Sequence, residues 1–245
     1  MAANKYDWSL VWKYHSQLLD GLVVAVRVSA VALVVSVICG LLLATMRMGR
    51  PPFAWVALIY INVFRGMPAL VTGIWIYFGV SLVLGYNFSV FQAGVIALSL
   101  LYSAFMSEIF RAALLAVPPG HREAGQALGM RGSRIFFSVV LPQATKIALP
   151  NIGSMLIGMV KDTSTFTIIG LVEVVRVTQN INSNQFQPFV LYTAAAALYV
   201  FAAFVIDLVF RLIEGAYSSP PRGGVSLLLR ARKQKRIRAL VAELA

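Results

Sequence analysis

The sequence is short of charge. Of its 245 residues only 12% are Asp, Glu, Lys or Arg, whereas 59% are hydrophobic, and the mean hydropathy is +0.80. An ordinary soluble domain carries about 25% charged residues. Half that density is too low to cover a water-facing surface, which argues against a soluble enzyme and against a disordered chain.

Residues that build catalytic and metal centres are also scarce. Cys39 is the single cysteine, and the two histidines, His15 and His121, lie far apart in the sequence. Neither a disulfide framework nor a cysteine-based metal cluster can be built from this set. The sequence has no G-x-x-x-x-G-K-[ST], H-E-x-x-H or G-x-S-x-G motif. We therefore expect no catalytic site, metal or cofactor in this chain, and a membrane enzyme lacks a complete set of catalytic groups.

Long apolar segments are abundant instead. A transmembrane helix needs about 20 mostly apolar residues. Segments of that kind cover 28–46, 66–107, 147–171 and 189–209, and 66–107 is long enough for two spans joined at Gly85-Tyr86-Asn87. The pattern predicts an all-α integral membrane protein with about five transmembrane helices.

The positive charges predict the orientation of these spans, because cytoplasmic loops carry an excess of Lys and Arg. Fifteen of the 21 Lys and Arg residues fall in 47–55, 111–147 and 211–245, whereas Lys5, Lys13 and Arg176 are the outer ones. The N-terminus is expected outside and the C-terminus inside.

The predicted organisation is an external segment over 1–21, a transmembrane domain over 22–215 and a basic cytoplasmic tail over 216–245. We expect the tail to contact anionic membrane lipid. Binding to nucleic acid is the alternative, but the tail lacks aromatic residues for stacking on bases.

One inner loop, about 118–142, has the pattern of a short surface helix. Glu123 to Leu128 are helix formers apart from one glycine, Gly129 suits a C-cap with positive φ, and Leu141-Pro142 marks the start of the next helix. Such a helix can dock a soluble partner. An ordinary connecting loop is the alternative.

This loop resembles the EAA loop of ABC importer permeases, in which E-A-A is followed by a spaced G and L-P. Glu123, Ala124, Gly129, Leu141 and Pro142 match that pattern, while Gly125 and Val139 replace the usual alanine and isoleucine. Further segments resemble the polar amino-acid branch of these permeases. They are N-V-F-R-G-M-P at 62–68, with Met67 as a departure, S-E-I-F-R at 107–111, L-P-Q-A at 141–144, K-D-T-S at 161–164 and I-G-L-V-E at 169–173.

The resemblance covers roughly residues 20–212 and implies a type I ABC importer permease fold with five spans and a cytoplasmic coupling helix. It implies that Glu123, Ala124, Gly125, Gly129, Leu141 and Pro142 form the loop that contacts the ATPase. The implied partners are ABC ATPase subunits that hold ATP and Mg²⁺, a second permease subunit of the same or a paralogous chain, and a periplasmic substrate-binding protein. The implied location is the bacterial inner membrane.

The implied function is ATP-driven import of a polar amino acid, with glutamate, aspartate or glutamine as first candidates. A stand-alone ion-coupled secondary transporter that uses Glu108 or Asp162 is the alternative.

Charged residues inside the apolar segments are the candidates for the substrate path, because such residues are costly in a bilayer. Glu108 and Arg111 can pair along one helix, as can Asp207 and Arg211. Arg65 precedes Gly66 and Pro68, which break a helix, and Lys161 to Ser164 form a second polar break. Transporters place substrate sites at such breaks near the midplane.

An amino-acid substrate presents a carboxylate and an ammonium group. Arg65 can bind the carboxylate through two parallel hydrogen bonds. Asp162, with the hydroxyls of Thr163 and Ser164, can bind the ammonium group. The alternative is that Arg65 and Asp162 neutralise each other, or a partner subunit, as packing elements.

Overall fold

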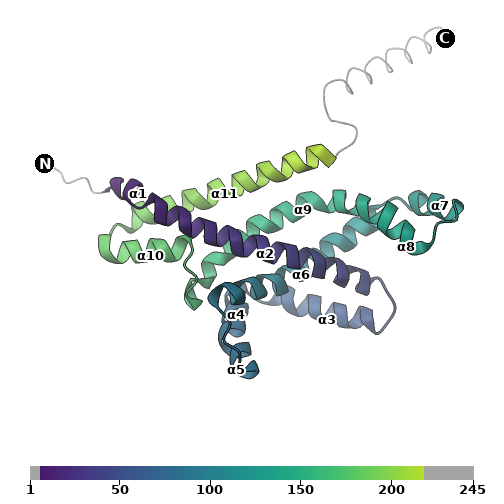
Figure 1. Cartoon of the computed structure of the whole chain (residues 1–245), viewed down its shortest axis with the longest axis horizontal. Coiled ribbons are helices and arrows are strands. Elements are labelled where there is room, and N and C mark those ends of the chain that lie inside the picture. Colours follow the sequence, from purple (N-terminus) through teal and green to yellow (C-terminus); the bar gives the residue numbers. More distant parts are fainter. Residues whose placement is uncertain (1–5, 218–245) are drawn as a thin grey trace, which may run out of the picture.

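The computed structural model describes residues 6–217, and the elements in this part of the chain are all helical. They are α1 (Ser9–Lys13), α2 (His15–Arg47), α3 (Phe53–Gly66), α4 (Ala69–Ile74), the π-helix η1 (Trp75–Val80), α5 (Ser81–Leu84), α6 (Val90–Ala116), α7 (Pro119–Ala127), α8 (Gly132–Ile135), the π-helix η2 (Phe136–Val140), α9 (Leu141–Asp162), the 3₁₀ helix η3 (Thr163–Ile169), α10 (Val174–Gln185) and α11 (Pro188–Tyr217). The long helices run lengthwise along the molecule (Figure 1). The predicted basic tail from position 218 onward lies outside the described residues.

Over residues 6–217 the structure has four candidate spans, or five if one bent pair of helices counts as a single span, against the five predicted. Four helical stretches of residues 6–217 are long and apolar enough to cross a membrane: His15–Arg47, Val90–Ala116, Gly132–Ile169 and Pro188–Ala216. The fifth is the pair Phe53–Gly66 and Ala69–Leu84, which is bent by 107°. Most spans extend beyond the uncharged runs, because a charged residue near a helix end does not interrupt the backbone hydrogen bonds.

The second span differs from the sequence-based prediction, which began it at Gly66. It begins at Phe53 and turns at Met67, which has extended backbone angles (φ −88°, ψ 135°). The residue before a proline avoids the helical region, so Pro68 forces the bend there. The predicted break near Gly85 is confirmed, since Gly85 ends α5 in the left-handed conformation at φ 64°.

The centre of the bundle is the contact between α2 and α6. Most buried positions of α2 are small and recur every three or four residues, among them Ala25, Ser29, Ala32, Ser36, Gly40 and Ala44. A Cβ added at Gly40 would overlap the Cβ of Met106 on α6. Small residues therefore bring these two backbones close together, as in other membrane helix pairs.

A buried carboxylate joins three elements near the start of α10. Glu173 is fully buried and accepts hydrogen bonds from the backbone N–H groups of Val175 and Arg176 at 3.0 and 2.9 Å. The hydroxyls of Thr167 in η3 and Tyr199 in α11 also donate to it. These donors satisfy the buried charge at a helix N-terminus, where a carboxylate is favoured, and they hold η3, α10 and α11 together.

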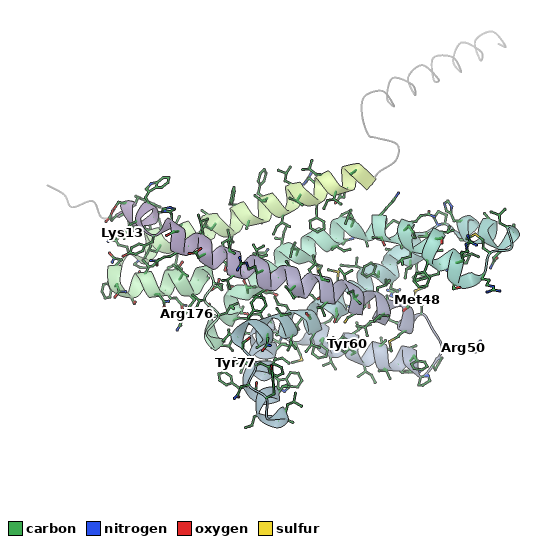
Figure 2. The ribbon with its side chains drawn as sticks, viewed as in Figure 1. Lys13, Met48, Arg50, Tyr60, Tyr77 and Arg176 are labelled. Atoms are coloured by element: carbon green, nitrogen blue, oxygen red, sulfur yellow. The ribbon has the colours of Figure 1, made fainter. Side chains whose placement is uncertain are left out.

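The short helices and the loops lie at the two ends of the bundle. The helices α1 and α10 lie at one end and α7 and α8 at the other, while α4 to α5 project to the side (Figure 1). Lys13 and Arg176 share the first end, and Arg50 lies near the second (Figure 2). The projecting segment is apolar and open, with Leu82 and Val83 each 84% exposed.

Candidate functional site

The two helix breaks predicted from the sequence border one cavity. The cavity has a volume of about 240 Å³ and lies between the α3–α4 bend, α6 and the end of α9. Its lining residues are Met67, Ala69, Leu101, Tyr102, Phe105, Met155, Gly158 and Asp162. We call it the Asp162 pocket, because Asp162 is the one charged residue in its lining.

Asp162 ends α9, and within residues 6–217 its carboxylate accepts a hydrogen bond from one side chain. The hydroxyl of Tyr102 donates to its Oδ2 at 3.0 Å, and Tyr102 itself is only 7% exposed. No ion pair within residues 6–217 includes Asp162. A carboxylate in the membrane without a cationic partner is costly, so this oxygen pair is a ready acceptor for a cationic group that enters the pocket.

Gly158 makes room for the tyrosine. It lies one turn before Asp162, and a Cβ at this position would be 2.7 Å from the Tyr102 hydroxyl. Sequence reasoning missed both Gly158 and Tyr102. The signal for Tyr102 was a hydroxyl within an apolar stretch of α6, but nothing local linked it to a residue sixty positions away.

The hydroxyls of Thr163 and Ser164 do not line the pocket. They donate to the carbonyl oxygens of Val160 and Lys161, both at 2.7 Å. These bonds satisfy carbonyls that the end of α9 leaves without a helical partner. The structure therefore brings Asp162 to the pocket but not these two neighbours.

Arg65 lies beside the pocket wall. Its guanidinium carbon is 5.7 Å from the centre of the Phe105 ring, which lines the pocket. Its Nη1 is 3.6 Å from Oε1 of Glu108. Among the described ion pairs none joins Arg65 to Asp162, so the predicted alternative of mutual neutralisation is not what the structure shows.

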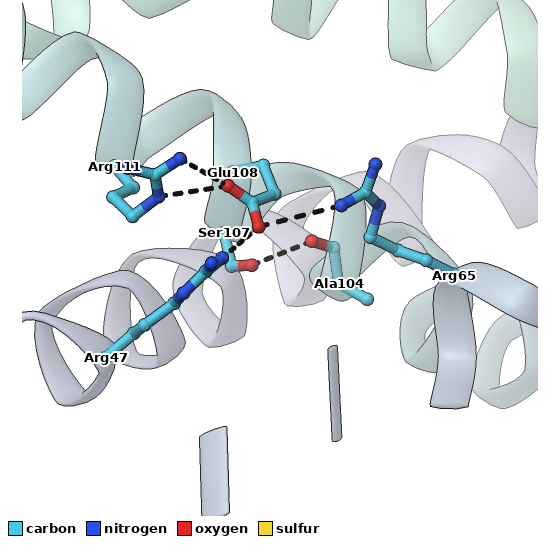
Figure 3. A network of polar contacts seen from close by, with 6 residues as sticks. All are labelled: Arg47, Arg65, Ala104, Ser107, Glu108 and Arg111. Carbon is cyan, nitrogen blue, oxygen red and sulfur yellow. Dashed lines mark hydrogen bonds and ion pairs between the residues drawn. The ribbon is translucent and has the colours of Figure 1, made fainter. Parts of the chain in front are cut away.

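Glu108 is surrounded by three arginines, which we call the Glu108 cluster (Figure 3). Arg111 approaches Oε2 with Nε and Nη2, both at 3.0 Å, which confirms the predicted pair within α6. Arg47 at the end of α2 donates to Oε1, and Arg65 makes the longer third contact. The cluster joins α2, α3 and α6 and carries two positive charges in excess.

The Glu108 cluster argues against Glu108 as the coupling residue of an ion-coupled transporter. A coupling carboxylate must change its protonation or its ion during transport, but three cations stabilise the charged form of Glu108.

The other predicted pair, Asp207 with Arg211, is also confirmed. Nε of Arg211 and Oδ2 of Asp207 are 2.7 Å apart on the exposed part of α11.

The inner loop contains the predicted short helix. α7 begins at Pro119, four residues before Glu123, because proline suits the first turn of a helix, and Gly129 has φ 70° as its predicted capping role requires. Glu123 and Ala124 are exposed, whereas Gly125 is buried. A Cβ at Gly125 would lie 3.0 Å from Cγ1 of Ile135, which explains a glycine where the pattern has alanine. Leu141-Pro142 was predicted to mark the start of the next helix, but the helical stretch already begins at Gly132 and continues through η2 into α9 at Leu141.

Comparisons with known proteins agree with these features. The profile of the family described as "Binding-protein-dependent transport system inner membrane component" matches residues 36–219. The arginine ABC transporter permease protein ArtQ of Escherichia coli (strain K12) is 34% identical over 186 residues, which cover 66% of this chain and 78% of ArtQ. The glutamine transport system permease protein GlnP of the same strain is 32% identical over 212 residues, which cover 86% of this chain and 97% of GlnP.

A solved structure has the same fold. It is described as an amino acid ABC transporter with histidines and superposes with a TM-score of 0.77 at 34% identity, covering 87% of this chain and 99% of the other. The MetNI methionine ABC transporter gives a TM-score of 0.73 at 20% identity, which supports the fold alone. The predicted type I ABC importer permease fold is confirmed.

Proposed function

Because this chain belongs to the binding-protein-dependent transport system inner membrane components, as the permease subunit of an amino-acid ABC importer, we propose that its Asp162 pocket carries a polar amino acid through the membrane. The chain is a transport subunit and not an enzyme, and ATP hydrolysis is carried by separate ATPase subunits. It is a multi-pass protein of the inner membrane.

The observation that carries the proposal is a carboxylate without a cationic partner, placed in a cavity between two broken helices. Asp162 can bind the ammonium group of an amino acid through a charge-assisted hydrogen bond. The hydroxyl of Tyr102, on the neighbouring helix α6, donates to this carboxylate and holds it in place. The remaining lining is mostly apolar, which suits the aliphatic part of the substrate.

Arg65 is proposed to bind the substrate carboxylate. Of the three ion pairs between arginines and Glu108, the one with Arg65 is the longest. When the Arg65 side chain moves toward the pocket, it therefore breaks the weakest ion pair of the cluster. Glu108 then keeps Arg47 and Arg111 and is not left unpaired. Thr163 and Ser164, which the sequence suggested as further ligands, contribute by ending α9 at the pocket.

The charge of the pocket narrows the substrate class. A glutamate or aspartate side chain would bring a second negative charge toward Asp162, whereas a neutral or cationic side chain would not. We therefore favour glutamine or a cationic amino acid over the acidic ones suggested at first. The relatives described above are named for arginine and glutamine, which supports this choice.

The substitution Asp162→Asn tests the pocket. It keeps an oxygen for the Tyr102 hydroxyl but removes the charge, so uptake by the reconstituted importer should fall about tenfold to hundredfold, since a hydrogen bond to a charged group contributes roughly 1.5–3 kcal/mol. The matched control is Asp207→Asn, which alters an exposed pair on α11 and should transport normally. Wild-type uptake of every amino acid by Asp162→Asn would exclude the pocket as the substrate site.

The partners follow from the family. We propose that α7 docks on the ATPase that holds ATP and Mg²⁺, with Glu123, Ala124, Gly125, Gly129, Leu141 and Pro142 shaping this coupling loop. Gly129→Val tests it, because a β-branched residue tolerates positive φ poorly. ATPase co-purification should fall while membrane insertion stays normal, and undiminished coupling would make the loop a plain connector.

The remaining assembly is also a proposal. A second permease subunit, of this chain or a paralogue, would cover the exposed apolar segment α4 to α5, and a periplasmic binding protein would deliver substrate at the α1 and α10 end. This arrangement requires the N-terminus outside and the C-terminus in the cytoplasm, as the positive charges predict. A reporter fused to each terminus measures that orientation.

A further inference from the structure

Two cavities share Arg122 of α7 in their lining. α7 lies at the end of the bundle that carries the basic inner loops (Figure 1). One cavity, of about 410 Å³, is lined by Thr45, Met48, Leu114, Arg122 and Phe136. The other, of about 240 Å³, is lined by Arg122, Gln126, Gly132, Ile135, Phe136 and Val140. Because the two cavities share Arg122 and Phe136, we treat them as one groove and call it the Arg122 groove.

Both cavities of the groove have apolar and polar residues in their lining, and Arg122 belongs to both. Met48, which follows the end of α2 (Figure 2), is 45% exposed and forms an apolar wall with Leu114 near the end of α6. On the α7 side the lining carries the guanidinium of Arg122 and the amide of Gln126. The groove therefore has an apolar part, formed by Met48, Leu114 and Phe136, and a polar part, formed by Arg122 and Gln126.

The charge of Arg122 is not neutralised within residues 6–217. No ion pair in this part of the chain includes it. Glu123 is the only acidic residue between Ile109 and Lys161, whereas Arg131 and Arg134 add further exposed positive charge to the same loop. An anion is thus the complementary ligand for the polar part.

We propose that the Arg122 groove binds an anionic phospholipid, with the phosphate on Arg122 and Gln126 and an acyl chain along Met48, Leu114 and Phe136. The site lies where α2 and α6 end, which is the level at which headgroups meet the bilayer core. Basic pockets between membrane helices on the cytoplasmic side bind such headgroups. The volume of the larger cavity lies within the range of about 300–1,000 Å³ that ordinary ligand pockets have.

The other occupants fit less well. A free phosphate would use Arg122 but has no need of an apolar wall. The chain's own tail is basic and would be repelled by the same arginine. An acidic loop of the ATPase would match the charge but would leave the apolar part open, and the experiment below separates this case. The proposal does not depend on the Asp162 pocket or on the identity of the substrate.

The experiment is native mass spectrometry of the purified permease–ATPase complex in nanodiscs of phosphatidylglycerol and, separately, of phosphatidylcholine. The variant Arg122→Gln is compared with Arg134→Gln, which removes the same charge from the same loop but lines neither part of the groove. We expect wild type and Arg134→Gln to retain phosphatidylglycerol. Arg122→Gln should retain about tenfold less, as expected for one lost charge-assisted hydrogen bond.

A second variant changes Met48, the groove residue that follows α2. Met48→Glu places a carboxylate beside the bound phosphate and should also lower retention, without any change in α7. Since Met48 is nearly half exposed, the substitution need not disturb the core, and gel filtration with ATPase activity checks assembly.

Several results would overturn the proposal. They are the absence of bound phospholipid from wild type, equal retention of the two lipids, and equal losses in Arg122→Gln and Arg134→Gln. Retained lipid together with lost ATPase in Arg122→Gln would assign the groove to the protein interface instead.

Discussion

Two carboxylates on the long helices of this bundle have opposite surroundings. Glu108 is contacted by Arg47, Arg65 and Arg111, and its side chain is 23% exposed. Asp162 has one neutral donor, the Tyr102 hydroxyl, and faces a cavity. Both residues have the same charge, but Glu108 has ion pairs with three arginines, whereas no ion pair in residues 6–217 includes Asp162.

The difference indicates which carboxylate can bind a substrate. The two oxygens of Glu108 are occupied by arginines from three helices, so a new cation would have to displace them. Asp162 can accept an ammonium group without losing an ion pair. The surplus of cations around Glu108 also means that Arg65 can move away while Arg47 and Arg111 still neutralise the Glu108 carboxylate.

The largest effect is expected from Glu108→Gln. This substitution leaves three arginines facing one another between α2, α3 and α6, and breaking one side of a fully buried pair costs about 3–5 kcal/mol. Because Glu108 is partly exposed, we expect about 2–3 kcal/mol, or a Tm lowered by roughly 5–10 °C. Thermal unfolding of the purified complex measures it.

The control for this experiment is Asp207→Asn, which alters an exposed pair four residues apart on α11 and should cost at most about 1 kcal/mol. If both variants unfold at the same temperature, the Glu108 cluster does not hold the three helices together. The only remaining difference between Glu108 and Asp162 would then be that Asp162 faces a pocket.

An intermediate effect is expected from Arg65→Lys. Lysine keeps the charge near Glu108 but loses the planar pair of donors that a carboxylate binds. We expect uptake to fall about tenfold to hundredfold with Tm nearly unchanged, because the Arg65 side chain is 44% exposed and its ion pair is long. Initial uptake rates, with ATPase assembly verified, are the measurement.

Comparison with Arg65→Ala separates the roles of this residue. Near-wild-type uptake by the lysine variant would contradict a two-point bond to the substrate carboxylate. Near-wild-type uptake by the alanine variant would remove Arg65 from the substrate path and leave it as a member of the Glu108 cluster.

The smallest effect is expected from Gly158→Ala. The added Cβ would meet the Tyr102 hydroxyl at 2.7 Å and push it away from Asp162. Transport should fall by about tenfold, as for loss of one hydrogen bond to a charged group. Gly215→Ala is the control, because nothing lies within 4 Å of a Cβ there.

A double variant makes this test specific to the tyrosine. Tyr102→Phe removes the hydroxyl that the alanine would displace, so Gly158→Ala should add little further loss when both are combined. Full additivity of the two losses would show that Gly158 acts through something other than Tyr102.

Features that depend on neighbours along the chain could be predicted. Apolar length predicted five spans, the turn at Gly85 and the cap at Gly129 followed from residues that tolerate positive φ, and the pair Glu108–Arg111 followed from helical spacing. The start of the second span could not be predicted in the same way. Its first half is too short to span a membrane alone, and only the 107° bend shows that it pairs with the segment after Pro68.

The sequence by itself determined the membrane class, the five apolar segments, the excess of positive charge on one set of loops and the two breaks at Arg65–Pro68 and Lys161–Ser164. Only the tertiary structure decided that both breaks border one cavity, that Tyr102 and not Thr163 or Ser164 contacts Asp162, and that Arg65 lies on Glu108. The reason is physical. Apolar length and backbone preference act over a few adjacent residues, whereas contacts between helices depend on their tilt and register, which arise only when the whole bundle packs.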